Sequence, residues 1–176
     1  MTEGLLALVF TVVGVAAKSM WDQYMARLSA RQGLASQARV RHLEAQLSQL
    51  YWPLYTRLMR DNALWEILKR RGDDDPEQAL LAATLERDII LPNHAAMLAI
   101  IEGNLHLAAG DAEVLAQIQR YVQHVAVFQA MRAAGVQHRD PIALGLPWPG
   151  NLFGAIERRA MALQAEYNAL LAEGAT

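Results

Sequence analysis

Two arginine–histidine pairs are the residues of this 176-residue chain whose types and spacing fit chemistry. Arg132 and His138 are separated by five residues across the end of a predicted helix. In such a pair the arginine would stabilise a scissile phosphate while the histidine moves the proton of a ribose 2′-hydroxyl. Arg120 and His124 stand one helical turn apart, where both could reach a shared anion or line a groove. The alternative for both pairs is a surface or interface role.

Other chemistries lack their motifs. The absence of cysteine removes disulfides, thiol nucleophiles and thiolate metal sites. The five histidines form no i, i+4 pair and no HExxH run, so we expect no metal site. The phosphate-loop, dinucleotide and hydrolase-elbow patterns are also missing. We therefore expect no cofactor, and we expect a protein that is not an enzyme unless the arginine–histidine pairs act.

Composition and charge describe one domain with an appendage. The chain is 53% hydrophobic and has 16 basic against 18 acidic residues, so its net charge of −2 gives no global attraction to nucleic acid. The first 42 residues hold five basic and two acidic residues, whereas the remainder holds eleven basic and sixteen acidic residues. An acidic body thus follows a basic collar.

Residues 4–17 form an uncharged, apolar run of 14 residues. An average bilayer core requires about 20 residues of helix, so the run is short by itself. It starts after Glu3 and has no small-residue cleavage site, which disfavours a signal peptide. If Lys18 snorkels and Trp21 lies at the interface, residues 1–21 are long enough for a thin bilayer. The run therefore predicts a transmembrane helix.

The charges that follow this run predict its orientation. Basic residues dominate residues 18–42, where Asp22 is the one acid. The positive-inside rule then places the N-terminus outside and the bulk of the chain in the cytoplasm. We expect a transmembrane helix at 1–21, a juxtamembrane collar at 22–42 and a helical bundle at 43–176. The basic residues are Lys18, Arg27, Arg31, Arg39 and Arg41.

Small or weakly polar residues recur at 3-4-3-4 spacing inside the apolar run, which places them along one stripe of a helix. Such residues allow close helix–helix contact in lipid, so the stripe predicts self-association. A ring of these helices could instead turn the stripe toward an aqueous lumen. The third alternative is that the stripe has no role. Its members are Gly4, Ala7, Thr11, Gly14 and Lys18.

The rest of the chain has helical periodicity and no sustained period-2 alternation, so we expect an all-α protein without a sheet. Gly33 and Pro53 are expected to bend the first long helix, and Asn93 is expected to be an N-cap. These pieces predict an up-down helical bundle. The helices are expected at residues 35–71, 76–89, 93–108, 111–133 and 151–172, with a proline-containing loop at 136–150.

Apolar stripes on these helices predict the core. Asn62 and Asn104 lie beside such stripes, where a buried amide needs a partner, so we expect either a polar contact between them or separate caps. The predicted core residues are Leu43, Leu47, Tyr51, Leu54, Leu58 and Trp65 in the first helix, Val114, Ile118, Tyr121, Val125 and Phe128 in the fourth, and Ile156, Ala160, Leu163, Tyr167 and Leu170 in the last.

The segments LYWPLY, DNALWE, LPNH, GNLHLA and RYVQHVAVF, together with the apolar start and basic collar, resemble small bacterial membrane-anchored helical proteins. Within that group the layout is most similar to the CRISPR accessory membrane protein that accompanies RNA-guided, RNA-cleaving effectors. The resemblance implies a ring-shaped homo-oligomeric pore in the bacterial inner membrane, with a divergent body like that of the helical HEPN ribonucleases. Arg132 and His138 match the HEPN spacing, whereas Arg120 and His124 are one residue too close.

The expected function is therefore permeabilisation of the membrane during antiviral defence. The expected partners are the lipid bilayer, further copies of the chain and, through the resemblance, a CRISPR effector complex or RNA. Two alternatives remain from the sequence, which are a membrane-anchored HEPN-like ribonuclease and a passive membrane-tethered scaffold.

Overall fold

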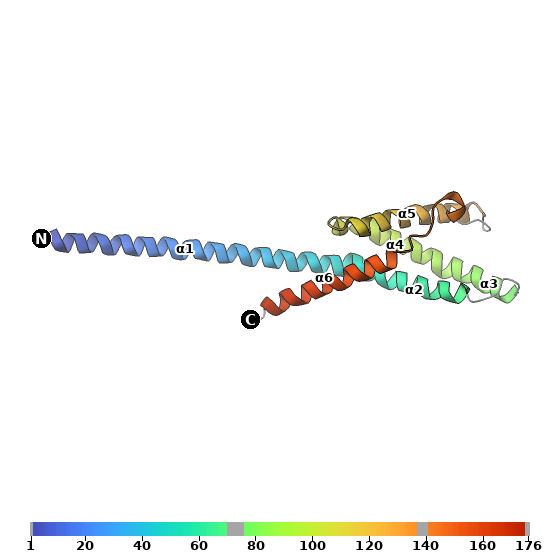
Figure 1. The fold of residues 1–176 in the computed structure, drawn as a ribbon, viewed down its shortest axis with the longest axis horizontal. Coiled ribbons are helices and arrows are strands. Elements are labelled where there is room, and N and C mark those ends of the chain that lie inside the picture. The colour runs from blue at the N-terminus through green and yellow to red at the C-terminus, as the bar shows by residue number, and fades with distance from the viewer. Residues whose placement is uncertain (1, 70–75, 137–140, 175–176) are drawn as a thin grey trace. The chain divides into compact units, whose positions relative to one another are not determined.

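The structure is a computed structural model that describes the backbone of residues 2–69, 76–136 and 141–174 and the side chains of residues 18–66, 76–136 and 141–173. Every regular element in these residues is a helix, so the predicted all-α class is confirmed (Figure 1). The elements are α1 (Thr2–Ala45), the π-helical turn η1 (Gln46–Tyr51), α2 (Trp52–Lys69), α3 (Pro76–Leu85), the π-helical turn η2 (Glu86–Ile90), α4 (Leu91–Asn104), the 3-10 turn η3 (Leu105–Ala108), α5 (Ala112–Ala133), the 3-10 turn η4 (Pro141–Leu144) and α6 (Leu152–Gly174).

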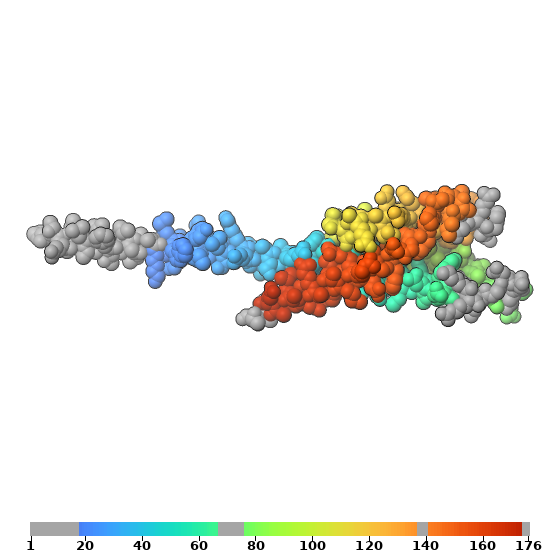
Figure 2. Space-filling model, viewed as in Figure 1, coloured from blue at the N-terminus to red at the C-terminus, as the bar shows by residue number. Residues whose placement is uncertain are grey.

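The chain divides into two compact units, Met1–His42 and Leu43–Thr176. The first unit is part of helix α1, and Figure 2 shows side chains standing out along its described residues. Of residues 18–42, all are exposed except Leu28 and Val40, which are half-buried. Among the residues with described side chains, no helix is long and apolar enough to cross a membrane. Residues 1–17 of the predicted span at 1–21, and every member of its stripe except Lys18, lie outside those residues, so the span and its stripe remain predictions.

Two prolines account for the two π-helical turns of the second unit. A proline inside a helix lacks an N–H, and its ring clashes with the carbonyl four residues earlier. For Pro53 that carbonyl belongs to Gln49 in η1, and for Pro92 it belongs to Asp88 in η2. A π turn widens the helix at that point, so the chain continues as a helix through both prolines. The predicted bend at Pro53 is thus a π turn in a helix that runs from Thr2 to Lys69.

The predicted separation of helices 76–89 and 93–108 is wrong. Helix α3 continues through η2 into α4, and the 3-10 turn η3 replaces the last predicted turn. Asn93 is not an N-cap, because the residue before α4 is the helical Ile90 and no side chain caps this point. Asn93 is instead 1% exposed and faces the interior. The dipeptide Pro92–Asn93 signals a helix start by its local preference, and the π turn overrides that preference.

Helices α2, α4, α5 and α6 form the bundle. Both α2 and α5 pack against α4 and α6, which gives a cyclic arrangement around one core. Figure 1 shows successive helices running in opposite directions, as in the predicted up-down order. The large residues of the core are Leu43, Leu47, Leu50, Tyr51, Leu54, Leu58, Met97, Ile101, Leu107, Val114, Ile118, Tyr121, Val125, Leu152, Ile156 and Leu163.

Helix α5 ends at the predicted Ala133 and begins at Ala112, one residue after the predicted start. The Asp111 side chain caps it by accepting a hydrogen bond from the Val114 backbone N–H at 3.0 Å. After Ala133 the chain turns at Gly135, whose φ of 74° favours glycine. The Val136 N–H then donates to the Met131 carbonyl at 2.9 Å, which closes the helix end.

The predicted core stripes are confirmed in the main. Phe128, Tyr167 and Leu170 are half-buried, and the side chain of Trp65 is 52% exposed. One turn before it, on the same face of α2, stands Asp61, which is 8% exposed. The buried face of α2 therefore ends in a polar residue, and the apolar core does not extend to Trp65.

Replacing Leu50 tests the register that η1 gives to the core. Leu50 is fully buried, so we expect Leu50→Ala to lower the free energy of unfolding by about 3 kcal/mol. The matched control is Leu80→Ala, because Leu80 is 70% exposed and its truncation should change that free energy by less than about 0.5 kcal/mol. Urea denaturation followed by circular dichroism measures both, and equal effects would contradict the described register.

Candidate functional site

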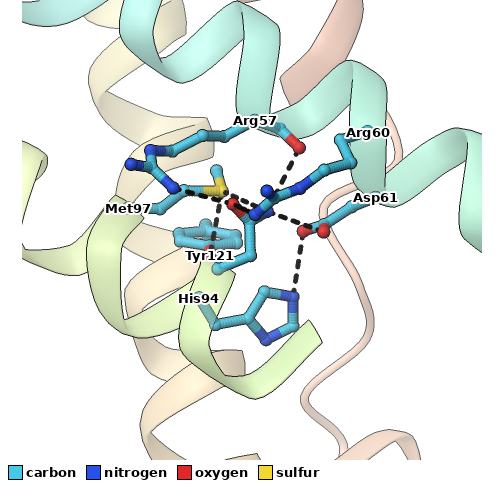
Figure 3. A network of polar contacts seen from close by, with 7 residues as sticks. Arg57, Arg60, Asp61, His94, Met97 and Tyr121 are labelled. Atoms are coloured by element: carbon cyan, nitrogen blue, oxygen red, sulfur yellow. Dashed lines mark hydrogen bonds and ion pairs between the residues drawn. The ribbon is translucent and has the colours of Figure 1, made fainter. Parts of the chain in front are cut away.

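A buried polar cluster joins α2 to α4 at the end of the apolar core (Figure 3). Asn93 is its centre, and its Nδ2 donates to Asp61 Oδ1 at 2.6 Å and to the Arg57 backbone carbonyl at 3.2 Å. Both partners of the side-chain bond are more than nine-tenths buried. A buried carboxylate is costly unless donors surround it, so this bond offsets part of the desolvation of Asp61.

Two arginines of α2 share the other end of the same amide. Arg57 Nη1 donates to Asn93 Oδ1 at 3.0 Å, and Arg60 Nη2 donates to the same oxygen. The residues are three apart in α2, which brings their side chains to neighbouring positions on one helix face. Figure 3 shows both guanidinium groups ending beside this contact. Two positive charges therefore meet at one neutral oxygen.

His94 completes the cluster on the side of the core. Its Nε2 lies 3.3 Å from Asp61 Oδ2, an ion-pair distance without the geometry of a hydrogen bond. Its ring contacts three aromatic residues at centroid distances of 5.8 to 6.0 Å. His94 Nδ1 is buried and has no hydrogen-bond partner among the described residues. The surrounding rings are those of Tyr121, Phe128 and Trp148.

Tyr121 seals the cluster from the α5 side. Its hydroxyl lies 3.4 Å from Met97 Sδ, a weak acceptor, and the ring is fully buried. Burial raises the pKa of the Tyr121 hydroxyl far above its usual value, and the negative charge of Asp61 adds to this effect. The phenol therefore stays protonated wherever the bundle is folded.

The Asp61–His94 pair has the composition of a carboxylate and the imidazole that it orients in general-base catalysis. In this structure aromatic rings cover the imidazole, and it is 5% exposed. The described arrangement thus holds α2, α4 and α5 together instead of presenting a base to substrate. The part of the cluster that reaches solvent is the arginine pair, since Arg57 is half-buried and Arg60 exposed.

The predicted pair of Arg132 and His138 is not seen as a pair, because His138 lies outside the described residues. Arg132 is bound within the bundle. Its guanidinium forms a 2.5 Å ion pair with Glu86 and lies 4.4 Å from the centre of the Phe128 ring. It also donates to the Val136 carbonyl at 3.0 Å. These contacts tie the end of α5 to η2.

The predicted pair of Arg120 and His124 serves the loop that follows α5. His124 is 7% exposed, and its Nδ1 lies 2.8 Å from the Leu146 carbonyl oxygen. Its ring meets the edge of Trp148 at 5.3 Å. Arg120 is exposed and lines a pocket of about 350 Å³ between α5 and residues 145–151, whereas His124 does not line it. The two residues therefore do not share an anion in this arrangement.

The asparagines chosen from the sequence are not the buried ones. Asn62 is exposed, and Asn104 is half-buried and donates to the Ile100 carbonyl of its own helix at 3.0 Å. The sequence prediction missed Asp61, which is adjacent to Asn62. It also missed the buried role of Asn93, which was expected to begin a helix. The spacing of Asp61 after Leu54 and Leu58 was the available signal, because it continues their face.

The predicted juxtamembrane residues Arg27, Arg31, Arg39 and Arg41 are exposed, and so is the stripe residue Lys18. The stripe residues Gly4, Ala7, Thr11 and Gly14 lie outside the described side chains. Among the described side chains, no group of three or more acidic or histidine residues is placed to hold a metal ion.

A comparison of the chain with known protein families, curated proteins and solved structures finds no match.

Removing the central amide should weaken the bundle. Asn93→Ala deprives Asp61 of its 2.6 Å donor and leaves both arginines without their shared acceptor, so we expect the free energy of unfolding to fall by about 3 kcal/mol. Asn62→Ala is the matched control, because Asn62 is exposed and should have an effect below about 0.5 kcal/mol. Urea denaturation of both variants decides between the two positions, and a larger loss for Asn62→Ala would contradict the described cluster.

Tyr121 should make the bundle sensitive to alkali. An unfolded tyrosine loses its proton near pH 10, whereas the raised pKa keeps Tyr121 protonated in the folded chain. Above about pH 10 the unfolded state thus binds fewer protons, and stability falls as the pH rises. We expect Tyr121→Phe to reduce this fall, and Tyr24→Phe in α1 to leave it unchanged. Urea midpoints measured from neutral to alkaline pH give the slopes, and parallel curves for wild type and Tyr121→Phe would contradict the assignment.

Proposed function

We propose that this chain is a membrane-anchored protein that self-associates through its N-terminal helix, and that the assembly permeabilises the bacterial inner membrane during antiviral defence. The observation that carries the proposal is the exposure of large apolar side chains directly after the apolar run. Met20, Trp21, Tyr24 and Met25 are between 44% and 73% exposed. A lone helix gains stability when such side chains enter a membrane interface, where tryptophan and tyrosine are enriched.

The charges around these residues support the same location. Lys18 and Arg27 are exposed on either side of the aromatic pair Trp21–Tyr24, whose ring centroids lie 6.2 Å apart. Long basic side chains place their stems in the interface and their charges in water. Basic residues on the cytoplasmic side also favour anionic lipid.

The length of α1 is sufficient for an anchor and a stalk. It has 44 residues, which at about 1.5 Å each is roughly 66 Å, about twice the thickness of a bilayer core. Residues 1–21 would then provide the span, and residues 22–42 would continue as the helix that passes through the headgroups.

Self-association rests on the stripe of Gly4, Ala7, Thr11, Gly14 and Lys18. Apolar burial gives no net attraction between helices in lipid, so small residues that permit close approach favour contact. A closed ring would place the weakly polar Thr11 and the charged Lys18 toward water. The pore, its inner-membrane location and its defence role are proposed from the resemblance to the CRISPR accessory protein. The same resemblance suggests a CRISPR effector complex or RNA as a partner.

The bundle supports a non-enzymatic role more than the HEPN-like alternative. Arg132 is held by Glu86 and stacked on Phe128, so its guanidinium is committed to contacts inside the bundle. No second arginine–histidine pair of the described chain converges on an exposed site. The passive scaffold differs from the pore in that it requires no closed ring.

Membrane insertion and flux test the proposal together. The purified chain should float with lipid vesicles, form a closed oligomer in detergent and release an encapsulated dye. We expect Gly14→Leu to abolish most of the dye release because the larger side chain separates the helices. The matched control is Val13→Leu, which adds bulk on another face and should retain release.

Four outcomes would contradict parts of this proposal separately. A chain that stays with the aqueous phase during flotation has no anchor. A chain that inserts but leaves the vesicles tight is no pore. A monomeric or dimeric particle in detergent favours the scaffold. Equal dye release by Gly14→Leu and Val13→Leu would contradict the role of the stripe in the pore.

A further inference from the structure

We propose that Arg57 and Arg60 form a binding site for a phosphomonoester on the surface of the bundle. Both guanidinium groups donate to one oxygen, Asn93 Oδ1, and so lie next to each other. An amide oxygen is neutral and has two lone pairs, which these two contacts occupy. The two arginines therefore share a hydrogen-bond acceptor that does not neutralise their positive charges.

The nearby acid does not neutralise the pair. Asp61 Oδ1 accepts a hydrogen bond from Asn93 Nδ2 at 2.6 Å, and Asp61 Oδ2 lies 3.3 Å from His94 Nε2. Within the described part of the chain, no carboxylate is within ion-pair distance of Arg57 or Arg60. Two positive charges and one buried negative charge leave this cluster with a surplus positive charge at its solvent side.

The site has space for a ligand. Pro53, Thr56, Arg57, Arg60 and Ile100 line a pocket of about 350 Å³ between α2 and α4. Each guanidinium carries five N–H groups and uses one of them on Asn93, so donors remain for a ligand in this pocket. The Thr56 hydroxyl donates to the Trp52 and Pro53 carbonyls at 3.1 Å, which leaves its oxygen as a weak acceptor.

The arrangement of donors favours a phosphomonoester over a carboxylate. Two planar guanidinium forks approach from neighbouring turns of one helix, and a group with three terminal oxygens can accept from both forks at once. A phosphomonoester carries a charge of about −1.5 to −2 at neutral pH, which exceeds the surplus charge of the cluster and matches the two arginines. The group could belong to a soluble phosphate compound or to a lipid headgroup such as phosphatidic acid.

The two guanidinium groups are held in fixed positions by Asn93. Asn93 is buried and held by Asp61 and the Arg57 carbonyl, so the acceptor that orients the two guanidinium groups cannot swing away. A site whose donors are already ordered loses less entropy when an anion binds. The buried Asn93 amide thereby preorganises the guanidinium groups of Arg57 and Arg60 for anion binding.

Titration calorimetry of the 176-residue chain with inorganic phosphate, a nucleoside monophosphate and a water-soluble short-chain phosphatidic acid tests this site. We expect saturable binding of at least one monoester probe. Arg60→Gln should weaken it by about tenfold or more, because a charge-assisted bond is lost. The matched control is Arg87→Gln, since Arg87 is exposed and paired with the adjacent Asp88, and it should leave the affinity unchanged.

The outcomes show separately whether the site exists and whether its phosphomonoester belongs to a soluble compound or to a lipid. Binding of phosphate or the nucleotide identifies a soluble ligand, whereas binding of phosphatidic acid alone identifies a lipid. Absence of saturable binding by every monoester probe would overturn the site, as would equal loss in Arg60→Gln and Arg87→Gln. Equal affinity for short-chain phosphatidylcholine, a diester, would overturn the preference for a monoester. Thermal unfolding of Arg60→Gln checks that the variant is folded, and none of these results depends on membrane insertion.

Discussion

The Asn93 amide is the contact on which the centre of the bundle depends. Asp61 is 8% exposed, and a carboxylate in that environment needs donors that the apolar core does not supply. The Asn93 amide nitrogen donates one hydrogen bond to Asp61 at 2.6 Å. The Asn93 amide oxygen accepts hydrogen bonds from the guanidinium groups of Arg57 and Arg60, which lie on the same helix as Asp61. One neutral side chain on α4 therefore joins an acid and two bases on α2, and it fixes how these two helices meet.

That contact in turn requires the continuous helix through Pro92. A π turn accommodates one additional residue, which rotates the following helix by about 100° relative to an uninterrupted α-helix. The turn at Glu86–Ile90 thus helps to set which face of α4 points inward, and Asn93, Met97 and Ile101 share that face. Pro53 has the same relation to Gln46–Tyr51, where the chain enters the core. The prolines bring both long helices into register without ending them.

The two units differ in what stabilises them. The bundle buries a continuous apolar core and closes one end with polar and aromatic contacts around His94. The first unit has no such core, because nearly all its described side chains are exposed. Trp21 and Tyr24 are among these exposed side chains, at 63% and 56%. This difference is why the N-terminal helix carries the membrane proposal and the bundle carries the anion site.

Local patterns in the sequence were sufficient to predict the all-α class, most of the core stripes of α2, α5 and α6, and the bounds of α5 to within one residue. The reason is that apolar periodicity, the Asp111 cap and the turn at Gly135 act over a few residues. The predicted buried amides, Asn62 and Asn104, were the wrong residues. Which of two adjacent residues faces the core depends on the π turns, and local patterns do not reveal these turns. The sequence prediction also expected Pro92 and Asn93 to begin a helix, which is their local preference. The burial of Asn93, the ion pair of Arg132 with Glu86 and the convergence of Arg57 and Arg60 depend on packing between helices, since these contacts join residues 33 to 46 positions apart in the chain.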